Sequence, residues 1–292
     1  WNAARFCEMN GCVRKLDFDP SSVEMTVNKW IVGETARTAA EVNAGLAAYR
    51  FNEAAGAVYH FVWDVFCDWY LEFIKPVLNG GNEDEKRETR QTAAWVLDRI
   101  LQMLHPFMPF ITEELWARTA EHATPRTSML MLSPWPDLAG LSAHEGARME
   151  MNWLIDLVAN VRSVRAEMNV PPAARIALIL KDASEESAAR LERHRDLVLT
   201  LARLSSASVS ADIPRGSPQF VIGQAVAALP LGDVIDLDKE RGRLAKEIRR
   251  AEDEMARIDG KLSNAAFVAN APAEIIDEQK EKRGEYAAGA AR

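Results

Sequence analysis

The feature that most constrains the fold is a repeating apolar seam in the C-terminal part of the chain. Its members are separated by seven residues and then alternately by four and three, with charged residues between them. The seam consists of Leu237, Leu244, Ile248, Ala251, Met255, Ile258 and Leu262. Because this spacing keeps one apolar stripe facing a partner helix, it predicts a coiled coil.

A break in the pattern at residues 263–271 indicates where the seam finds its partner. Pro272 suits the first turn of a second helix, where its missing N–H costs nothing. We therefore expect an antiparallel helical hairpin over residues 236–292, with Phe267 and Val268 packing at its tip. The alternative is a single helix that dimerises with another chain.

The first half of the chain has a different character. All eight tryptophans lie between Trp1 and Trp153, which indicates a large aromatic core there. Apolar residues at helical spacing predict long helices over residues 27–49, 52–78 and 83–104. Long amphipathic helices with short connections imply a helical bundle, which we place at residues 1–146.

Two short motifs set expectations for helix ends in this bundle. Lys75-Pro76 is expected to close the helix over 52–78, because proline cannot continue a helix interior. After the break at residues 105–110, Thr112-Glu113-Glu114 is expected to start a short helix through Trp116. The carboxylates of Glu113 and Glu114 are then interpreted as favourable charges at that helix N-terminus rather than as an acid–base pair.

The segment 147–235 mixes helix and strand signals. The expected elements are a helix over 149–168, a buried strand over 175–180, a helix over 184–204, and short strands near 206–210 and 220–222, the latter extended by 224–230 as a hairpin. This pattern predicts a small α/β module between the bundle and the arm. The fold as a whole is expected to be mainly α.

Composition excludes several classes of protein. The chain has 292 residues, a net charge of −8 and 48% hydrophobic residues, which fits two or three globular domains rather than a disordered tail. No apolar run approaches the ~20 residues of a membrane span, and the first residues do not resemble a secretory signal. Three cysteines do not suit a disulfide set or a zinc site. We expect a cytoplasmic protein with no membrane partner and no metal.

Three common motifs of phosphate-binding and metal-dependent catalytic sites are absent. The sequence contains no G-x-x-x-x-G-K-[ST] loop, no G-x-G-x-x-G and no H-E-x-x-H, and its five histidines are scattered. We therefore expect no catalytic residues in this chain.

The first arm of the hairpin carries a basic face. Its cations are Arg241, Arg243, Lys246, Arg249, Arg250, Arg257 and Lys261, with acidic residues interspersed among them. From charge alone, a solvated coiled-coil face with i,i+4 ion pairs is slightly favoured over a nucleic-acid contact. The overall acidity argues against non-specific coating of nucleic acid but leaves room for a local contact.

Four stretches carry a family resemblance. They are Trp-Asn-Ala-Ala-Arg-Phe at 1–6, Phe-Cys-Asp-Trp-Tyr-Leu-Glu at 66–72 with Lys75-Pro76, Leu-His-Pro-Phe-Met-Pro-Phe-Ile-Thr-Glu-Glu-Leu-Trp at 104–116, and Lys-Leu-Ser-Asn at 261–264 with Phe267-Val268 and Ala271-Pro272. In order and spacing these resemble the valyl-tRNA synthetases over the whole chain. The first three also resemble relatives that charge other branched aliphatic amino acids.

The resemblance implies an anticodon-binding helical bundle, a connecting module and a tRNA-binding arm, working as a monomer on a valine-accepting tRNA. The family's ATP-handling motifs, H-I-G-H and K-M-S-K-S, are absent from this sequence. We therefore expect an upstream catalytic domain that binds ATP and Mg²⁺, with no cofactor in the present chain. The opening at Trp1, which is not an initiator methionine, agrees with that expectation.

The resemblance also suggests which residues contact tRNA. An anticodon loop presents unstacked bases that aromatic rings and guanidinium groups can stack against. We expect Arg5 and Trp30 on that surface, with Asn2 and Arg37 as weaker neighbours. The alternatives are core packing for Trp30 and an ion pair with the acidic bundle for Arg5.

On the arm, the cations are expected to meet phosphates without reading sequence. The residues concerned are Lys246, Arg249, Arg250, Arg257 and Lys261. Ala265 stands where the family usually has proline, and Gly242, Gly284 and Gly289 weaken the helices. We therefore expect the arm to fray towards its C-terminal end.

Three other interpretations stay open at this point. The chain could be the equivalent segment of an isoleucine or leucine enzyme. Some of those enzymes carry a C-terminal zinc module, but this chain has no cysteine after Cys67 to form one. It could be a scaffold that assembles through its coiled coil. The third interpretation is a free-standing enzyme, which the scattered histidines disfavour.

Overall fold

The computed structural model describes residues 1–121, 125–232, 234, 237–264 and 272–291. The chain divides into two compact units, Trp1–Asn160 with Ser184–Ala202 and Val161–Ala183 with Arg203–Arg292. Helix α7 (Glu145–Glu167) runs through the expected boundary between residues 146 and 147 and contributes to both units. The boundaries expected at 146 and 235 stay predictions.

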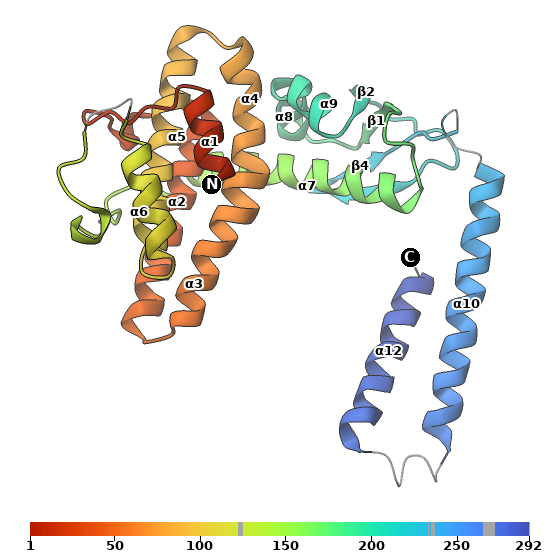
Figure 1. The fold of residues 1–292 in the computed structure, drawn as a ribbon. Coiled ribbons are helices and arrows are strands. Elements are labelled where there is room, and N and C mark those ends of the chain that lie inside the picture. Colours follow the sequence, from red (N-terminus) through yellow and green to blue (C-terminus); the bar gives the residue numbers. More distant parts are fainter. Residues whose placement is uncertain (122–124, 233, 235–236, 265–271, 292) are drawn as a thin grey trace. The chain divides into compact units, whose positions relative to one another are not determined.

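The first unit is a bundle of helices, as expected. Its members are α1 (Asn2–Met9), α2 (Thr26–Ala47), α3 (Phe51–His60), α4 (Leu71–Gly80), α5 (Glu83–Leu104), α6 (Pro109–Arg118), the first part of α7, α8 (Glu185–Arg193) and α9 (Arg195–Leu201), with a π-helical segment at Phe61–Tyr70 and 3₁₀ turns at Pro20–Ser22 and Leu130–Leu132. Helices α2, α3, α4 and α5 lie side by side (Figure 1), and α2 and α4 both pack against α5.

Helix α5 illustrates how local sequence defines an element. Its expected bounds, residues 83–104, are confirmed. The helix begins at Glu83 because the Asn82 side chain caps it, accepting hydrogen bonds from the N–H groups of Asp84 and Glu85 at 3.0 and 2.9 Å. The Glu85 carboxylate accepts in turn from the Asn82 N–H, which completes a capping box. The apolar stripe of α5, including Val96, Leu97 and Leu101, is buried in the bundle.

The expected helix end at Lys75-Pro76 is wrong. Pro76 lies inside α4, which continues to Gly80. Proline removes one N–H donor from the helix ladder, but Phe73, Ile74 and Leu78 on either side of it are buried. Their burial stabilises the helical path across the proline. The preceding segment is π-helical, a form seen mostly as short insertions within α-helices.

The expected start of the short helix at Thr112 is also wrong. Helix α6 begins at Pro109, which occupies a first-turn position that proline favours. Glu113 therefore does not lie in the first turn, and its carboxylate accepts hydrogen bonds from the N–H groups of Leu130 and Met131 at 2.7 and 3.2 Å. Glu114 pairs with Arg118 at 2.7 Å. Both carboxylates thus have structural partners.

The second unit contains the small sheet expected from the strand signals. It consists of β1 (Ile176–Lys181), β2 (Leu204–Val209), β3 (Gln219–Ile222) and β4 (Ala225–Ala228), in the order β2-β1-β4-β3. β1 pairs with β2 in parallel, and β4 pairs antiparallel with both β1 and β3, so the expected hairpin is confirmed. The mainly α fold with a small α/β part is confirmed.

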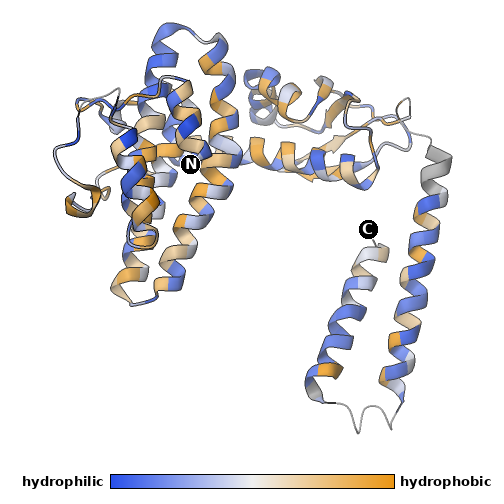
Figure 2. Cartoon of the chain, in the orientation of Figure 1, coloured by the Kyte–Doolittle hydropathy of each residue, from blue (hydrophilic) through white to orange (hydrophobic). Residues whose placement is uncertain are grey.

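The expected helical arm is confirmed in α10 (Leu237–Ser263) and α12 (Ala273–Ala291), which pack against each other. Ile258 of the seam is 5% exposed, and Arg283 donates hydrogen bonds to Asp259 at 2.6 and 3.1 Å across the pair. Both helices are mostly hydrophilic with isolated hydrophobic positions (Figure 2), as a two-helix seam requires. Phe267 and Val268, expected at the tip, lie outside the described residues.

None of the helices in the described part of the chain combines the length and the apolar composition of a membrane span.

Candidate nucleic-acid interface

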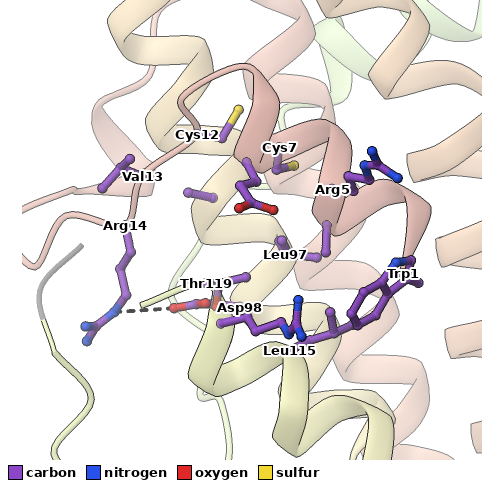
Figure 3. Close-up of a pocket in the computed structure, with 14 residues that line it drawn as sticks. Trp1, Arg5, Cys7, Cys12, Val13, Arg14, Leu97, Asp98, Leu115 and Thr119 are labelled. Carbon is purple, nitrogen blue, oxygen red and sulfur yellow. Dashed lines mark ion pairs between the residues drawn. The ribbon is translucent and has the colours of Figure 1, made fainter. Parts of the chain in front are cut away.

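A cavity of about 310 Å³ opens in the first unit among α1, α5 and α6 (Figure 3). Trp1, Arg5 and Glu8 line it from α1 and its N-terminus, and Leu97 and Asp98 from α5. Leu115 and Arg118 of α6, with Thr119 directly after that helix, line it from a third side. The lining therefore mixes apolar side chains with cations and carboxylates, as small-molecule sites in general do.

An exposed indole and a guanidinium group lie together at the rim of this cavity. The Arg118 guanidinium lies 4.9 Å from the centroid of the Trp1 ring, and 54% of Trp1 is exposed. The Glu114 carboxylate holds Arg118 in place at 2.7 Å. The rim thus presents two planar groups that can stack against a third flat ring.

Arg5 lies on α1, and its side chain is exposed where it lines the cavity. Within the described ranges it forms no ion pair, so the alternative of a salt bridge with the acidic bundle is not observed. Its placement in an open cavity agrees with the surface position expected from the sequence.

A buried ion pair supports the inner wall. The Arg126 guanidinium donates to both oxygens of Asp98, at 2.8 and 2.6 Å, and the two side chains are 8% and 5% exposed. Arg126 also lies 3.5 Å from the centroid of the Trp116 ring, and Arg14 approaches Asp98 at 3.4 Å. Burial and the neighbouring Arg126 lower the pKa of Arg14, while Asp98 opposes that shift. The wall is therefore rigidly cross-linked.

The structure does not bring the other expected residues into the cavity. The prediction that Trp30 lies on the surface is wrong, because its ring is 2% exposed and packs edge-on against Phe73 at 5.8 Å. Trp30 lies on the inner face of α2, where burial of a large indole outweighs its polar N–H. Arg37 pairs with Glu34 on α2 and lies outside the cavity lining, and Asn2 is exposed at the start of α1.

The arm presents its own charged surface. Lys246, Arg250, Arg257 and Lys261 are spaced by four, seven and four residues, so they share one face of α10. At 100° per residue this stripe lies about 130° around the helix from the apolar seam that faces α12. All four side chains are exposed. A stripe of this kind can lie along a polyanion while the seam holds the hairpin together.

Neighbouring acids satisfy some of the arm cations. Arg257 pairs with Glu254 at 3.0 Å, and Arg243 pairs with Glu247. Lys246, Arg249 and Arg250 have no ion pair in the described part of the chain. The solvated-face interpretation therefore holds for part of the arm, and the remaining cations are available to an external anion.

The histidines and carboxylates of the described residues pair with neighbouring side chains or stand apart. In the described ranges no three His, Cys, Asp or Glu side chains are grouped as metal ligands. His60 is paired with Asp64 on the exposed face of its helix at 2.8 Å, and His194 with Glu150 at 2.5 Å. The cavity itself offers stacking and charge rather than a nucleophile with its base.

Sequence reasoning missed Trp1, Arg118 and Asp98 as parts of this site. They come from three separate helices or helix ends, and no local spacing relates them. The resemblance indicated Arg5 alone among the cavity residues, because its motif marks α1 but not the helices that α1 packs against.

Comparison with known proteins agrees with the division into a bundle and an arm. Residues 28–180 match the family of the anticodon-binding domain of tRNA ligase. Residues 236–292 match the family of the valyl tRNA synthetase tRNA binding arm. The first match alone covers more than half of the chain.

Whole-chain relatives point the same way. The valine–tRNA ligase of Caulobacter vibrioides is 50% identical over 292 residues, which are 100% of this chain and 32% of the relative. Those of Rhizobium meliloti and Nitrobacter winogradskyi are 49% and 46% identical and match 97% and 99% of this chain, or 30% and 33% of each relative. The chain therefore spans about a third of the length of the curated relatives it matches.

The rival interpretations from the sequence differ from these findings. The relatives reported above are valine–tRNA ligases, not isoleucine or leucine enzymes and not coiled-coil scaffolds. The family that matches the arm is that of the valyl enzyme. The chain belongs to the valine–tRNA ligase family and corresponds to the C-terminal portion that carries the anticodon-binding domain and the tRNA-binding arm.

Proposed function

We propose that this chain holds a valine-accepting tRNA in register for a valine–tRNA ligase, which attaches valine to that tRNA with ATP. The chemistry, with its ATP and Mg²⁺, belongs to the catalytic and editing parts that make up the rest of such a ligase. The chain works with that catalytic domain in the cytoplasm and as a monomer. The observation that carries the proposal is the open cavity beside Arg5, where stacking groups and a free cation converge.

The cavity is suited to an unstacked base of the anticodon loop. Its volume of about 310 Å³ lies at the lower end of the ~300–1,000 Å³ of small-molecule sites. Trp1 and Arg118 supply stacking planes, and Arg5 supplies donors for a base edge or the adjoining phosphate. Asn2 and, more remotely, Arg37 are proposed to contact the neighbouring nucleotides. The proposed site does not include Trp30, whose ring is 2% exposed.

Substitution of Arg5 tests the anticodon site. We expect Arg5→Ala to weaken binding of an anticodon stem-loop by about tenfold or more, since a hydrogen bond from a charged donor is worth ~1.5–3 kcal/mol. Arg87→Ala is the matched control, because Arg87 is an exposed arginine of the same unit that pairs with Asp84 away from the cavity. Filter binding compares the valine anticodon with a swapped anticodon on the same stem.

Three outcomes are informative. A loss confined to Arg5→Ala and to the valine anticodon supports base recognition in the cavity. Equal losses of affinity for Arg5→Ala and Arg87→Ala would mean that Arg5 contributes only its positive charge and recognises no base. Unchanged binding by Arg5→Ala refutes the proposed site.

The arm is proposed to bind the tRNA body through phosphates. The cations proposed for this contact are Lys246, Arg249, Arg250, Arg257 and Lys261. Each phosphate contact releases counterions, so it steepens the fall of affinity with salt by roughly one unit of log–log slope. Binding along the backbone positions the tRNA but does not read its sequence.

A pair of double variants tests this contact. Lys246→Gln with Arg250→Gln removes two charges from the stripe on α10, and Lys280→Gln with Lys282→Gln removes two from α12, where they pair with Asp277 and Glu278. We expect only the first variant to weaken binding of whole tRNA and to flatten its salt dependence, by about two units of slope. The same affinity and slope in both variants would refute the role of the stripe.

A further inference from the structure

Two cysteines meet at the C-terminal end of α1. Gly11 adopts a left-handed conformation with φ of 69°, and its N–H donates to the Glu8 carbonyl at 3.1 Å. The Cys12 N–H donates to the Cys7 carbonyl at 2.9 Å. These two bonds define a Schellman motif, which places the side chains of its first and last residues next to each other. In this chain those residues are Cys7 and Cys12.

The backbone geometry places the pair within reach of a covalent bond. The 2.9 Å hydrogen bond joins the Cys7 carbonyl oxygen to the Cys12 nitrogen. Adding the distance from each of these atoms to its own Cα limits the Cα–Cα separation to about 6.8 Å. Disulfides usually span Cα–Cα separations of ~4.4–6.8 Å. The Cα–Cα separation in the folded α1 end is therefore one that a disulfide can span.

The two thiols have different surroundings. Cys7 is 1% exposed, whereas Cys12 is half-buried, and both line the cavity (Figure 3). Hydrogen bonding with Cys12 and then burial raise the pKa of Cys7 well above its ordinary value. Cys7 is therefore held as a protonated thiol, while a small oxidant that enters the cavity reaches Cys12 first.

We propose that Cys7 and Cys12 form a redox-sensitive modification site that closes to a disulfide under peroxide. Hydrogen peroxide takes both electrons in the first step, and the disulfide forms in a second step that needs no further oxidant. Cys12 thiolate attacks hydrogen peroxide, which gives Cys12 sulfenic acid and releases hydroxide. The Cys7 sulfur then attacks the sulfenic sulfur, and the Cys7 proton leaves with the displaced hydroxyl group as water. A dithiol reductant reverses the reaction by exchange.

Peptide mapping tests the site directly. The 292-residue chain is treated with hydrogen peroxide, unfolded in denaturant and alkylated there with iodoacetamide, so that every free thiol is accessible. Trypsin then cleaves after Arg5 and Arg14 and so keeps Cys7 and Cys12 on one peptide. We expect that peptide to lose both alkylation sites and to regain them after dithiothreitol. Cys67 is on a different peptide and serves as the internal reference, and we expect it to stay alkylated.

Single variants separate this pair from other chemistry. With Cys67→Ser we expect the same intrapeptide disulfide, and with Cys12→Ser we expect Cys7 to remain fully alkylated because its buried thiol lacks a partner. A disulfide that joins Cys67 to either cysteine, or oxidation of Cys12 to sulfinic acid with no loss at Cys7, would overturn the proposal. Circular dichroism of each variant before oxidation verifies that the helices are intact, and a Cys12→Ala variant replaces Cys12→Ser if that one unfolds.

Discussion

Replacement of Asp98 by asparagine is expected to destabilise the first unit strongly. Asp98→Asn keeps the shape of the side chain but removes the charge that faces Arg126 and Arg14. Arg126 is 8% exposed, and among the described residues it keeps two further acceptors, the Trp116 carbonyl at 3.2 Å and the Thr119 hydroxyl at 3.0 Å. A buried cation that loses its partner costs about 3–5 kcal/mol.

The chain is well suited to measuring this effect. All eight tryptophans lie between Trp1 and Trp153, within the unit that contains Asp98. Intrinsic tryptophan fluorescence therefore follows unfolding of that unit and not of the arm. For a cooperative unit of this size, a loss of 3–5 kcal/mol corresponds to a fall in midpoint temperature of about 6–20 °C.

An exposed ion pair on α6 provides the control. Glu114→Gln breaks a pair whose side chains are 55% and 54% exposed, and such pairs contribute about 0–1 kcal/mol. The reasoning is refuted if Asp98→Asn and Glu114→Gln lower the free energy of unfolding equally, because the cost of burying the cation would then be absent. A double variant, Asp98→Leu with Arg126→Met, is expected to recover part of the loss, since paired removal leaves fewer buried charges unmatched.

Three further changes have defined outcomes. Asn82→Ala removes the capping box of α5 and should cost ~1 kcal/mol in urea unfolding of the bundle; no loss would contradict the cap. Gly284→Ala should raise the thermal stability of the arm by up to ~1 kcal/mol by circular dichroism, because a Cβ there meets no atom within 4 Å. Burial of Glu150 raises the pKa of its carboxyl group, but the hydrogen bonds with His194 and Arg193 outweigh burial, so that the pKa is lowered overall. Stability from this carboxylate is present above its unfolded pKa of ~4.3 and is lost as pH falls through the lower folded value, so Glu150→Gln should flatten the acid limb of an unfolding titration.

Fraying of the arm towards Arg292, expected from its glycines and short return helix, stays a prediction. Hydrogen exchange measures it directly, and strong protection of the amides to the end of α12 would contradict it.

Much of the fold follows from short-range patterns. Helix α5 begins and ends where the sequence predicts, because Asn82 caps it locally and its apolar stripe has helical spacing. The arm follows from the heptad seam for the same reason, since residues four and three apart must lie on one face of a helix. The motif around Arg5 predicted an exposed side chain, and Arg5 is exposed on α1; its contact with tRNA stays a proposal.

Long-range packing decided the rest. Trp30 and Arg5 are both plausible surface residues by type, yet the inner face of α2 buries one and the open side of α1 exposes the other. Pro76 continues a helix that its local preference would end, because buried neighbours stabilise the helical path. The cavity needs Trp1, Asp98 and Arg118 from separate parts of the sequence. Sequence spacing specifies which face of a helix is apolar, but only the packed bundle specifies which side chains meet across it.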